Sequence, residues 1–283
     1  MKDFTGRVAA VTGAGSGIGR ALADALARRG AHLALSDIDR SSLAETAAQC
    51  EDFGVKITSA QLDVADRAAV YSWADGVVAD HGRVNLIINN AGVALGATVE
   101  SMSYEDFEWL MNINFWGVVY GTKAFLPHLK RSGEGHIVNL SSVFGLISVP
   151  SQSAYNAAKF AVRGFSESLR MELEIEGADV SVTTIHPGGI KTNIARNARI
   201  HASVRDVAGN PERAVSDFER TFITSPEKAA AQILTAVRRD RRRALIGPDA
   251  KAIDFISRLP ASIYQSVLTR GATRLRRQPD REH

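Results

Sequence analysis

A hydroxyl, a phenol and an ammonium group stand close together in the middle of the sequence. Tyr155 follows Ser142 by thirteen positions, and Lys159 follows Tyr155 by four. Residues four apart on a helix lie one turn apart on the same face, so the phenol and the ammonium would point the same way. A free phenol has a pKa near 10, and a nearby cation stabilises its phenolate and lowers that pKa. Tyr155 could then exchange a proton with a substrate oxygen that Ser142 holds.

The residues around this trio predict a strand, a loop and a helix. The apolar run 137–140 indicates a short buried strand, and Ser142 lies where that strand ends. Ser153 suits the N-cap of a helix that extends to about Glu176 and carries the tyrosine and the lysine. An isolated Tyr-x-x-x-Lys is usually an ordinary helix with a packed tyrosine and a solvated lysine. The rest of the chain therefore has to decide between the two interpretations.

A glycine cluster near the N-terminus follows the apolar run 7–12 and precedes a helical pattern that closes at Gly30. Glycines let the backbone approach a pyrophosphate, and a helix N-terminus offers free N–H groups and the positive end of the helix dipole. The spacing is Gly-x-x-x-Gly-x-Gly rather than G-x-G-x-x-G, but a strand, a glycine turn and a helix in succession predict dinucleotide binding. The expected contacts of this turn are Gly13, Gly15, Ser16, Gly17, Ile18 and Gly19.

The second predicted strand, 31–36, ends at Asp37. A carboxylate at this place can accept hydrogen bonds from the adenosine ribose and would repel a 2′-phosphate. Neither Ser16 nor Ile38 is a cation, and Arg40 could point to solvent. The sequence therefore favours NAD over NADP, with Asp37 and Ile38 among the cofactor contacts.

Strands and helices continue to alternate after Asp37, which predicts an α/β fold: a Rossmann-like, doubly wound parallel sheet flanked by helices. Ligands of such sheets bind at the carboxyl ends of the strands. Asp63 and Val64 follow one predicted strand, and Asn90, Ala91 and Gly92 follow another. Both groups could be simple turn residues, but the edge that they share with the glycine turn favours a place in the cofactor groove.

Two further polar residues lie in apolar surroundings. Asn114 falls inside a predicted helix from about 104 to 130, where a buried amide needs hydrogen-bond partners; it could hold a water molecule or serve packing. His186 follows the predicted strand 179–185 and precedes a Pro-Gly turn, which favours a structural role over that of a base.

The composition is that of an ordinary soluble globular protein of 283 residues with one cysteine, Cys50. A single cysteine suits a reducing compartment, and no signal peptide or membrane-spanning run is evident, so a cytoplasmic location is expected. No metal site is expected. The net charge of +3 conceals a basic C-terminal part: residues 238–283 hold twelve Lys/Arg and five Asp/Glu, a charge of +7. A solvated surface is favoured there over nucleic-acid binding.

Taken together, these motifs resemble the short-chain dehydrogenase/reductase family over about residues 4–246. Thr12-Gly13-x-x-x-Gly17-x-Gly19 resembles its cofactor turn, and Asn89-Asn90-Ala91-Gly92 resembles its sheet-stabilising motif. The resemblance implies that Tyr155 is the general acid/base and that Ser142 orients the substrate oxygen. It implies that Lys159 lowers the phenol pKa and binds the nicotinamide ribose, and that Asn114 anchors a water. The segment that would meet the nicotinamide holds Pro187, Gly188, Ile190 and Thr192.

The resemblance also suggests a domain plan. A catalytic domain would cover 1–250, with a substrate lid at about 189–224, and a basic helical extension would cover 251–283, divided by Pro260. The extension could pack on the body, join subunits, or rest on a membrane surface; the first two are favoured. A homotetramer or homodimer is implied by resemblance.

The expected function is an oxidoreductase that transfers a hydride between NAD(H) and a secondary alcohol or ketone. Apolar residues in 143–150 and 93–95 either line a lipophilic substrate or fill core, and the sequence does not separate these two readings. The alternatives are an NADPH-dependent reductase of carbonyls or 3-oxoacyl thioesters, which Asp37 opposes, and a non-catalytic dinucleotide sensor, which the intact catalytic set opposes.

Overall fold

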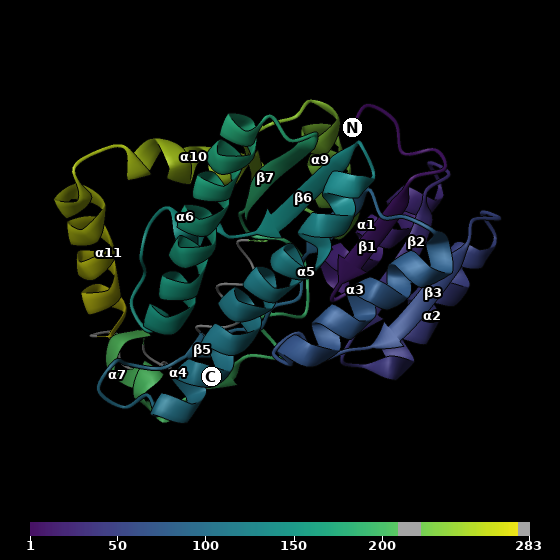
Figure 1. Ribbon diagram of the computed structural model, residues 1–283. Coiled ribbons are helices and arrows are strands. Elements are labelled where there is room, and N and C mark those ends of the chain that lie inside the picture. The colour runs from purple at the N-terminus through teal and green to yellow at the C-terminus, as the bar shows by residue number, and fades with distance from the viewer. Residues whose placement is uncertain (209–221, 277–283) are drawn as a thin grey trace.

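The computed structural model describes residues 1–208 and 222–276, and it confirms the α/β architecture (Figure 1). Seven parallel strands form one sheet in the order β3-β2-β1-β4-β6-β7-β9. The chain runs outward from β1 to β3 and then crosses to the other side of β1, so β1 and β4 flank the switch point where such folds bind ligands. The strands are β1 (Val8–Thr12), β2 (His32–Asp37), β3 (Ile57–Gln61), β4 (Leu86–Asn89), β6 (Gly135–Leu140), β7 (Val180–Pro187) and β9 (Arg243–Ile246).

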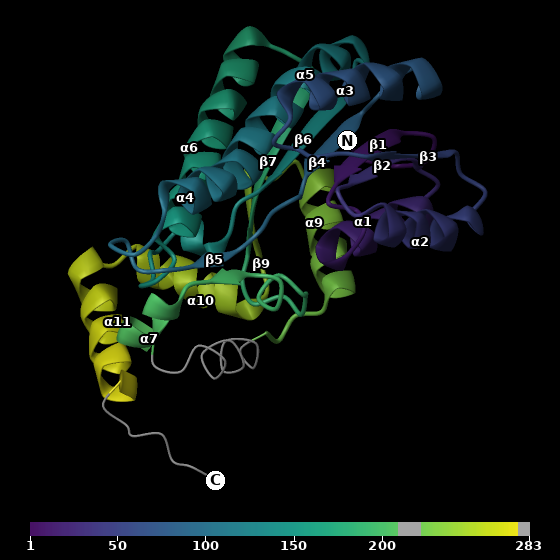
Figure 2. The same cartoon turned by 90° about the horizontal axis from the view of Figure 1, so that it is seen from below.

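Helices cover both faces of the sheet, as Figure 2 shows. Each face has its own core of buried aliphatic side chains, because a strand buried on both sides must pack apolar residues in both directions. One core lies under α1 (Gly17–Ala27), α2 (Arg40–Glu51) and α9 (Pro226–Arg238), and the other under α3 (Arg67–His81), α5 (Gly117–Arg131) and α6 (Ser153–Glu176).

The long helix expected from 104 to 130 is interrupted. It consists of α4 (Tyr104–Met111), a π-helical turn (Asn112–Trp116) and α5. In the π turn, the Gly117 N–H donates to the Asn112 carbonyl, one residue earlier than in an α-helix. Single π-helical turns inside α-helices are often found at functional sites, and this turn contains Asn114. The spacing of apolar residues does not predict such a turn, because one extra residue changes the helical period only locally.

The N-cap expected at Ser153 is wrong by one residue. Gln152 caps α6 without a side-chain hydrogen bond, and Ser153 is the first helical residue. Ser151 precedes this cap with a φ of +62°, which turns the chain sharply into the helix.

Short elements beyond the main sheet were not predicted. β5 (Leu95–Gly96) pairs in parallel with β8 (Arg199–Ile200), so the chain after β4 lies against the chain after β7. A helical turn, α7 (Arg205–Ala208), follows. The middle of the predicted lid, 209–221, which contains Arg213, lies outside the described residues.

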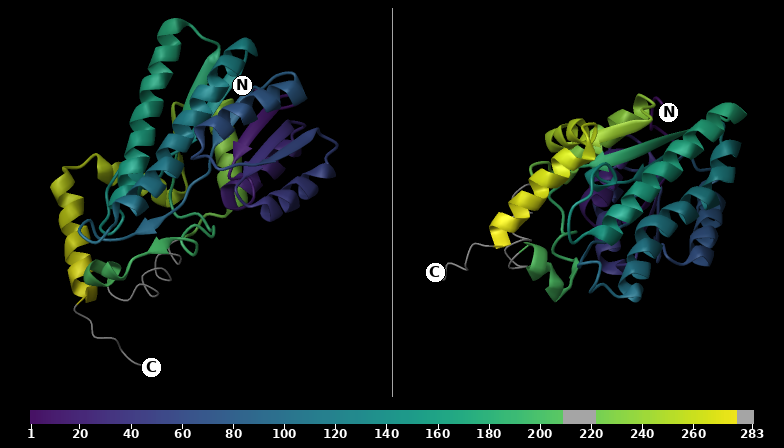
Figure 3. Two further views of the ribbon diagram at one scale, coloured as in Figure 1. Left: turned by 60° about the horizontal axis from the view of Figure 1, so that its bottom comes forward. Right: turned by 90° about the vertical axis from the view of Figure 1, so that its left-hand side faces the viewer.

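After the last strand come α10 (Pro248–Ser257) and α11 (Ala261–Arg276), with Pro260 between them as predicted. Figure 3 shows these helices at one edge of the molecule, away from β1–β3. Within residues 1–208 and 222–276, no helix combines the length and apolar character needed to cross a membrane.

Candidate active site

The structure brings Ser142, Tyr155 and Lys159 together at the carboxyl end of β6. Ser142 lies directly beyond the strand, in extended conformation. Lys159 is only 4% exposed, and its Nζ donates a hydrogen bond of 3.0 Å to the Leu140 carbonyl. The same Nζ lies 5.4 Å from the centre of the Tyr155 ring. One turn of α6 therefore places the phenol and the ammonium on the face that meets the strand end.

Burial governs the ionisation of this pair. It raises the pKa of Tyr155 to about 12, and the hydroxyl of Ser142 opposes that rise by hydrogen bonding to the phenol oxygen. Burial also lowers the pKa of Lys159 to about 8, since the ammonium loses its hydration. The sequence led us to expect the lysine to pull the tyrosine pKa down. Burial of the phenol is the larger effect here, and it raises the pKa of Tyr155 instead.

Ser142 is held from two directions. Its hydroxyl accepts a hydrogen bond of 3.1 Å from the Phe144 N–H, and its carbonyl accepts one of 2.8 Å from Nδ1 of His186. His186 is fully buried, and burial lowers its pKa to about 4, so the imidazole is neutral at pH 7. A neutral ring that donates from Nδ1 positions the strand end, in line with the structural role predicted for this histidine.

The side-chain amide of Asn114 makes two hydrogen bonds to the chain that follows β4. Its Oδ1 accepts from the Val93 N–H and its Nδ2 donates to the Val93 carbonyl, both at 2.8 Å. Gly92 lies beside it: a Cβ added there would come within 3.2 Å of Asn114 Oδ1 and 3.7 Å of Lys159 Nζ. The structure thus places Asn114 next to the Ser–Tyr–Lys group, with both the oxygen and the nitrogen of its buried amide hydrogen-bonded to Val93.

The glycine turn is packed against the end of β4. A Cβ on Gly13 would lie 2.8 Å from the Ala91 Cα, and one on Gly19 would lie 2.0 Å from the Gly13 carbonyl oxygen. The Nδ2 of Asn90 donates to that same oxygen at 3.1 Å. These contacts leave no room for a side chain, so the backbone itself forms the surface of the turn. A bare backbone at a helix N-terminus suits a pyrophosphate.

Asp37 is the carboxylate nearest this turn. Its Oδ2 accepts a hydrogen bond of 2.8 Å from the Gly15 N–H, and its Oδ1 accepts one of 2.9 Å from the Asp39 N–H. Each oxygen keeps a further lone pair for a hydroxyl donor. Ile38 beside it is 63% exposed. This arrangement fits a ribose diol.

The sequence reasoning missed a cation beside the same turn. The guanidinium of Arg20, on α1, donates to the Gly15 carbonyl at 2.6 Å and contacts the Glu45 carboxylate at 3.0 Å. The Arg20 guanidinium is therefore already hydrogen-bonded by two groups of the protein itself. Its position three residues after Gly17, in the first turn of α1, is the only signal that the sequence offers for this contact.

The remaining predicted contacts fall into two sets. Asp63 is exposed and accepts from the Ala65 N–H at 2.9 Å, which is turn chemistry, while Val64 is buried against Gly117. Beyond β7, a Cβ on Gly17 would lie 3.0 Å from the Thr192 side chain, so this segment reaches over the glycine turn. Its described members include Pro187, Gly188, Ile190 and Thr192.

Asp249, at the start of α10, was also missed. Its Oδ2 accepts a hydrogen bond of 2.6 Å from the Gly189 N–H, and a Cβ on Gly188 would collide with the carboxylate. The last helical region is therefore tied to the segment that reaches over the glycine turn. Nothing in the spacing of the sequence signals this long-range contact.

The apolar segments on the substrate side divide between core and surface. Val143, Leu146 and Ile147 are buried core residues. Phe144 is half-buried and meets Tyr155 edge-on, with ring centres 6.3 Å apart and planes at 84°. Phe144 is thus the residue of this loop that borders the phenol.

A doubly wound parallel sheet with a glycine turn at its switch point is the class of fold that binds dinucleotides. The family model for short chain dehydrogenases matches residues 7–203. The chain belongs to the short-chain dehydrogenase family of oxidoreductases.

Individual relatives agree with this assignment. The protein SadH of Mycobacterium tuberculosis is 48% identical over 276 residues, which cover 97% of this chain and 98% of SadH. A short chain dehydrogenase/reductase from Burkholderia phymatum, crystallised in complex with NAD, is similar in structure with a TM-score of 0.82 and 30% identity; the match covers 100% of this chain and 99% of that one. Carveol dehydrogenase from Mycobacterium avium, in complex with NAD, has a TM-score of 0.72 and 28% identity over 83% of this chain and 91% of its own.

Proposed function

We propose that this protein transfers a hydride between NAD(H) and a lipophilic secondary alcohol or ketone. The observation that carries the proposal is the placement of Ser142, Tyr155 and Lys159 at the same sheet edge as the glycine turn. That edge offers a proton donor, a cation and a hydroxyl beside a surface of bare backbone. When bound, NAD would supply the hydride chemistry.

The residues that would hold the cofactor are those already located. The bare turn from Gly13 to Gly19 suits the pyrophosphate, and Asp37 suits the adenosine ribose. Asp37 opposes a 2′-phosphate by charge, and Arg20, the nearby cation, is already engaged by Gly15 and Glu45. Related structures crystallised with NAD support the same preference.

Tyr155 would give or take the proton of the substrate oxygen. Its raised pKa keeps the phenol protonated at pH 7, which is the form that gives a proton to the substrate oxygen in ketone reduction. Alcohol oxidation needs the phenolate, and the cationic form of Lys159 would stabilise it. Ser142, fixed through its own backbone by His186, would orient the oxygen. Asn114 would hold the chain after β4, and a water beside its amide would continue the proton path.

The surroundings of the phenol favour a lipophilic substrate. Phe144 flanks Tyr155, and the partly exposed Val93 and Val149 lie on neighbouring segments. Apolar surfaces of this kind bind apolar substrates by excluding water. The name of carveol dehydrogenase, a structural relative, is consistent with an alcohol of this type. A cytoplasmic homotetramer or homodimer, with a lid at about 189–224, completes the proposal.

The proposal is tested by following NADH formation from NAD across a panel of aliphatic alcohols, diols, sugars, steroids and retinoids. The control is Tyr155→Phe, which keeps the ring and removes the hydroxyl. We expect turnover of at least one lipophilic alcohol to fall by about a thousandfold in the variant, the size of a general acid/base contribution. NADH binding, followed by its fluorescence, should remain. Unchanged turnover in Tyr155→Phe would overturn the assignment, and NADH binding without turnover of any alcohol or ketone would favour a dinucleotide sensor.

A further inference from the structure

The helices after the last strand leave apolar side chains in solvent. Phe255 is 68% exposed and Val267 is 66% exposed, and Ile256, Leu259 and Ile263 are exposed by 37% to 48%. Isolated exposed apolar residues are ordinary, but several within thirteen consecutive positions mark an interaction surface.

On α11 the large exposed apolar side chains share one face. Ile263 and Val267 are four residues apart on this helix, so they lie on the same side of it, and Leu259 is exposed in the turn that precedes the helix. Arg270 comes three residues after Val267 and continues that face, exposed to solvent. We call Ile263, Val267 and Arg270 the outer stripe. It joins an apolar part to a basic part along a single side of the helix.

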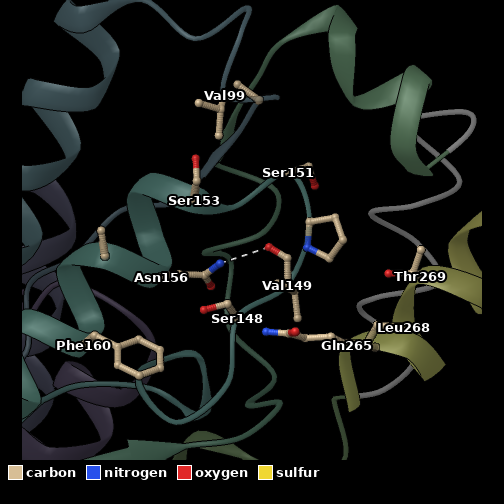
Figure 4. A pocket seen from close by; sticks show the side chains of 13 residues that line it. Val99, Ser148, Val149, Ser151, Ser153, Asn156, Phe160, Gln265, Leu268 and Thr269 are labelled. Carbon is tan, nitrogen blue, oxygen red and sulfur yellow. Dashed lines mark hydrogen bonds between the residues drawn. The ribbon is translucent and has the colours of Figure 1, made fainter. Parts of the chain in front are cut away.

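The opposite side of α11 faces the body of the protein. The Tyr264 hydroxyl accepts a hydrogen bond of 3.4 Å from the Ser148 N–H. Next to this contact, a groove of about 590 Å³ separates α11 from α6, with Leu268 and Thr269 on one wall and Phe160 on the other (Figure 4). The outer stripe therefore points away from the core, and no packing on the described residues accounts for its apolar side chains.

The positive charge of the C-terminal region indicates what kind of partner could cover the outer stripe. Between residues 255 and 279 the sequence contains five arginines and no aspartate or glutamate. Asp254, just before, is 8% exposed and already pairs with Arg243 and Arg258 at 3.0 Å. A two-fold interface would set this stripe against its own copy and bring like charges together, with no carboxylate inside the segment to offset them. An anionic partner is complementary to it.

We propose that the outer stripe of α11 docks on the surface of a membrane that contains anionic lipids. Ile263 and Val267 would enter the boundary between head groups and acyl chains, and Arg270 would reach a lipid phosphate. A helix with exposed apolar side chains can lie in such an interface without crossing the bilayer, and a long arginine side chain beside them can extend to the charged head groups. Because Tyr264 contacts the loop of Ser148, docking would hold the substrate side of the protein at the lipid surface. The proposal does not depend on the reaction that the enzyme catalyses.

The test is co-sedimentation of the full chain with vesicles of phosphatidylcholine, with and without phosphatidylglycerol, at low salt. The variants are Ile263→Glu/Val267→Glu, which places charge on the apolar part, and Arg270→Glu, which reverses the basic part. Tyr104→Glu is the matched control, because Tyr104 is 85% exposed on α4, remote in sequence from the stripe. Thermal unfolding and NADH binding check that each variant is folded, and analytical ultracentrifugation reports its mass.

We expect the wild type and Tyr104→Glu to sediment with phosphatidylglycerol vesicles and to be released by salt. The double variant should lose sedimentation, and Arg270→Glu should bind about thirtyfold more weakly, since it changes the charge near the surface by two. Failure of the wild type to bind anionic vesicles would overturn the proposal, as would full binding of the double variant. If the double variant instead lowers the oligomer mass while the wild type ignores vesicles, the stripe is a subunit contact and the proposal is wrong.

Discussion

Two edges of this molecule differ in whether their functional side chains have partners within the chain. At the carboxyl ends of β1, β4 and β6, polar and charged side chains are hydrogen-bonded to backbone groups. Lys159 bonds to the Leu140 carbonyl, Asn114 to Val93, and Asp37 to the Gly15 N–H. At the edge made by α10 and α11, large apolar side chains such as Phe255 and Val267 remain in solvent.

The difference shows whether the side chains of each edge are held in place by the chain itself or by a partner. A buried polar group must find a partner within the chain, so the edge at the strand ends is fixed by the fold itself. An exposed apolar stripe is not fixed in this way, and its partner must come from outside the chain. Substitutions should therefore damage the first edge through the fold or the chemistry, and should affect the second only when a partner is present.

The largest effect is expected from Gly19→Ala. The new methyl group would lie 2.0 Å from the Gly13 carbonyl oxygen, so the backbone of the glycine turn must move. We expect the free energy of unfolding to fall by about 3 kcal/mol or more, and NADH binding to be lost. Chemical denaturation measures the first and fluorescence titration the second. Gly76→Ala is the control: nothing lies within 4 Å of its new methyl group, in the middle of α3, and it should stabilise the protein by about 1 kcal/mol. Equal damage from both substitutions would contradict the close packing of the turn.

Lys159→Met should separate activity from stability. Turnover should fall by about a hundredfold or more, because the cation that supports the phenolate is gone. Stability at pH 7 should be kept or raised, since burial holds the pKa of Lys159 at about 8, below its unfolded value. The unfolded chain then binds the proton more tightly, and the folded state pays a penalty of about 3 kcal/mol below pH 8 that fades as the pH rises toward 10.5. The lost hydrogen bond to Leu140 offsets part of the gain.

The readouts for this variant are steady-state kinetics and thermal unfolding. Lys228→Met, at an exposed position of α9, should change neither. A Lys159→Met protein that is markedly less stable than the wild type would mean that the lysine is a structural element of the edge rather than a strained functional group.

Asp37→Asn should change the choice of cofactor by a smaller amount. The amide keeps the shape but removes the charge that binds a ribose diol and repels a 2′-phosphate, so NADH should bind about tenfold more weakly and NADPH more tightly. Titrations with both cofactors give the ratio. Asp39→Asn is the matched control, because Asp39 caps α2 through the Ser41 and Ser42 N–H groups. If Asp39→Asn shifts the ratio as much as Asp37→Asn, the assignment of Asp37 fails.

A further effect concerns stability in acid. His136 and His186 are fully buried, and burial lowers their pKa values to about 3 and about 4 from 6.5. The unfolded chain binds more protons in this range, so stability falls as the pH drops from 6.5 toward 4. At pH 5 we expect each histidine to cost about 2 kcal/mol. Denaturation curves at pH 7 and pH 5 measure the slope, and His136→Asn should flatten it; an unchanged slope would show that carboxylates dominate.

The sequence could predict which residues gather at the strand ends because the signals for strand ends are local. Apolar runs ending in glycine, aspartate or asparagine identify strand ends, and parallel strands gather these ends at one edge. The four-residue spacing of Tyr155 and Lys159 fixed their common face in advance. These features depend on neighbours in the chain.

The features that the sequence did not predict depend on distant contacts. The π turn at Asn114 breaks the regular helical period by one residue. Asp249 meets Gly189 across sixty positions, and the pairing of β5 with β8 spans more than a hundred. The high pKa of Tyr155 follows from burial, which spacing does not report. The exposure of the outer stripe likewise needed the packing of α11, because an amphipathic pattern does not say which face finds a partner.

The central claim is that Tyr155 and its neighbours serve hydride transfer to a carbonyl carbon. It is tested most directly by incubating the protein with NADH that carries two deuterium atoms at C4 and a lipophilic ketone from the panel, and analysing the product by mass spectrometry. The account predicts one deuterium on the carbinol carbon of the alcohol from the wild type, and none above background from Tyr155→Phe although that variant still binds NADH. Deuterium transfer that survives in Tyr155→Phe at the wild-type rate would contradict the account.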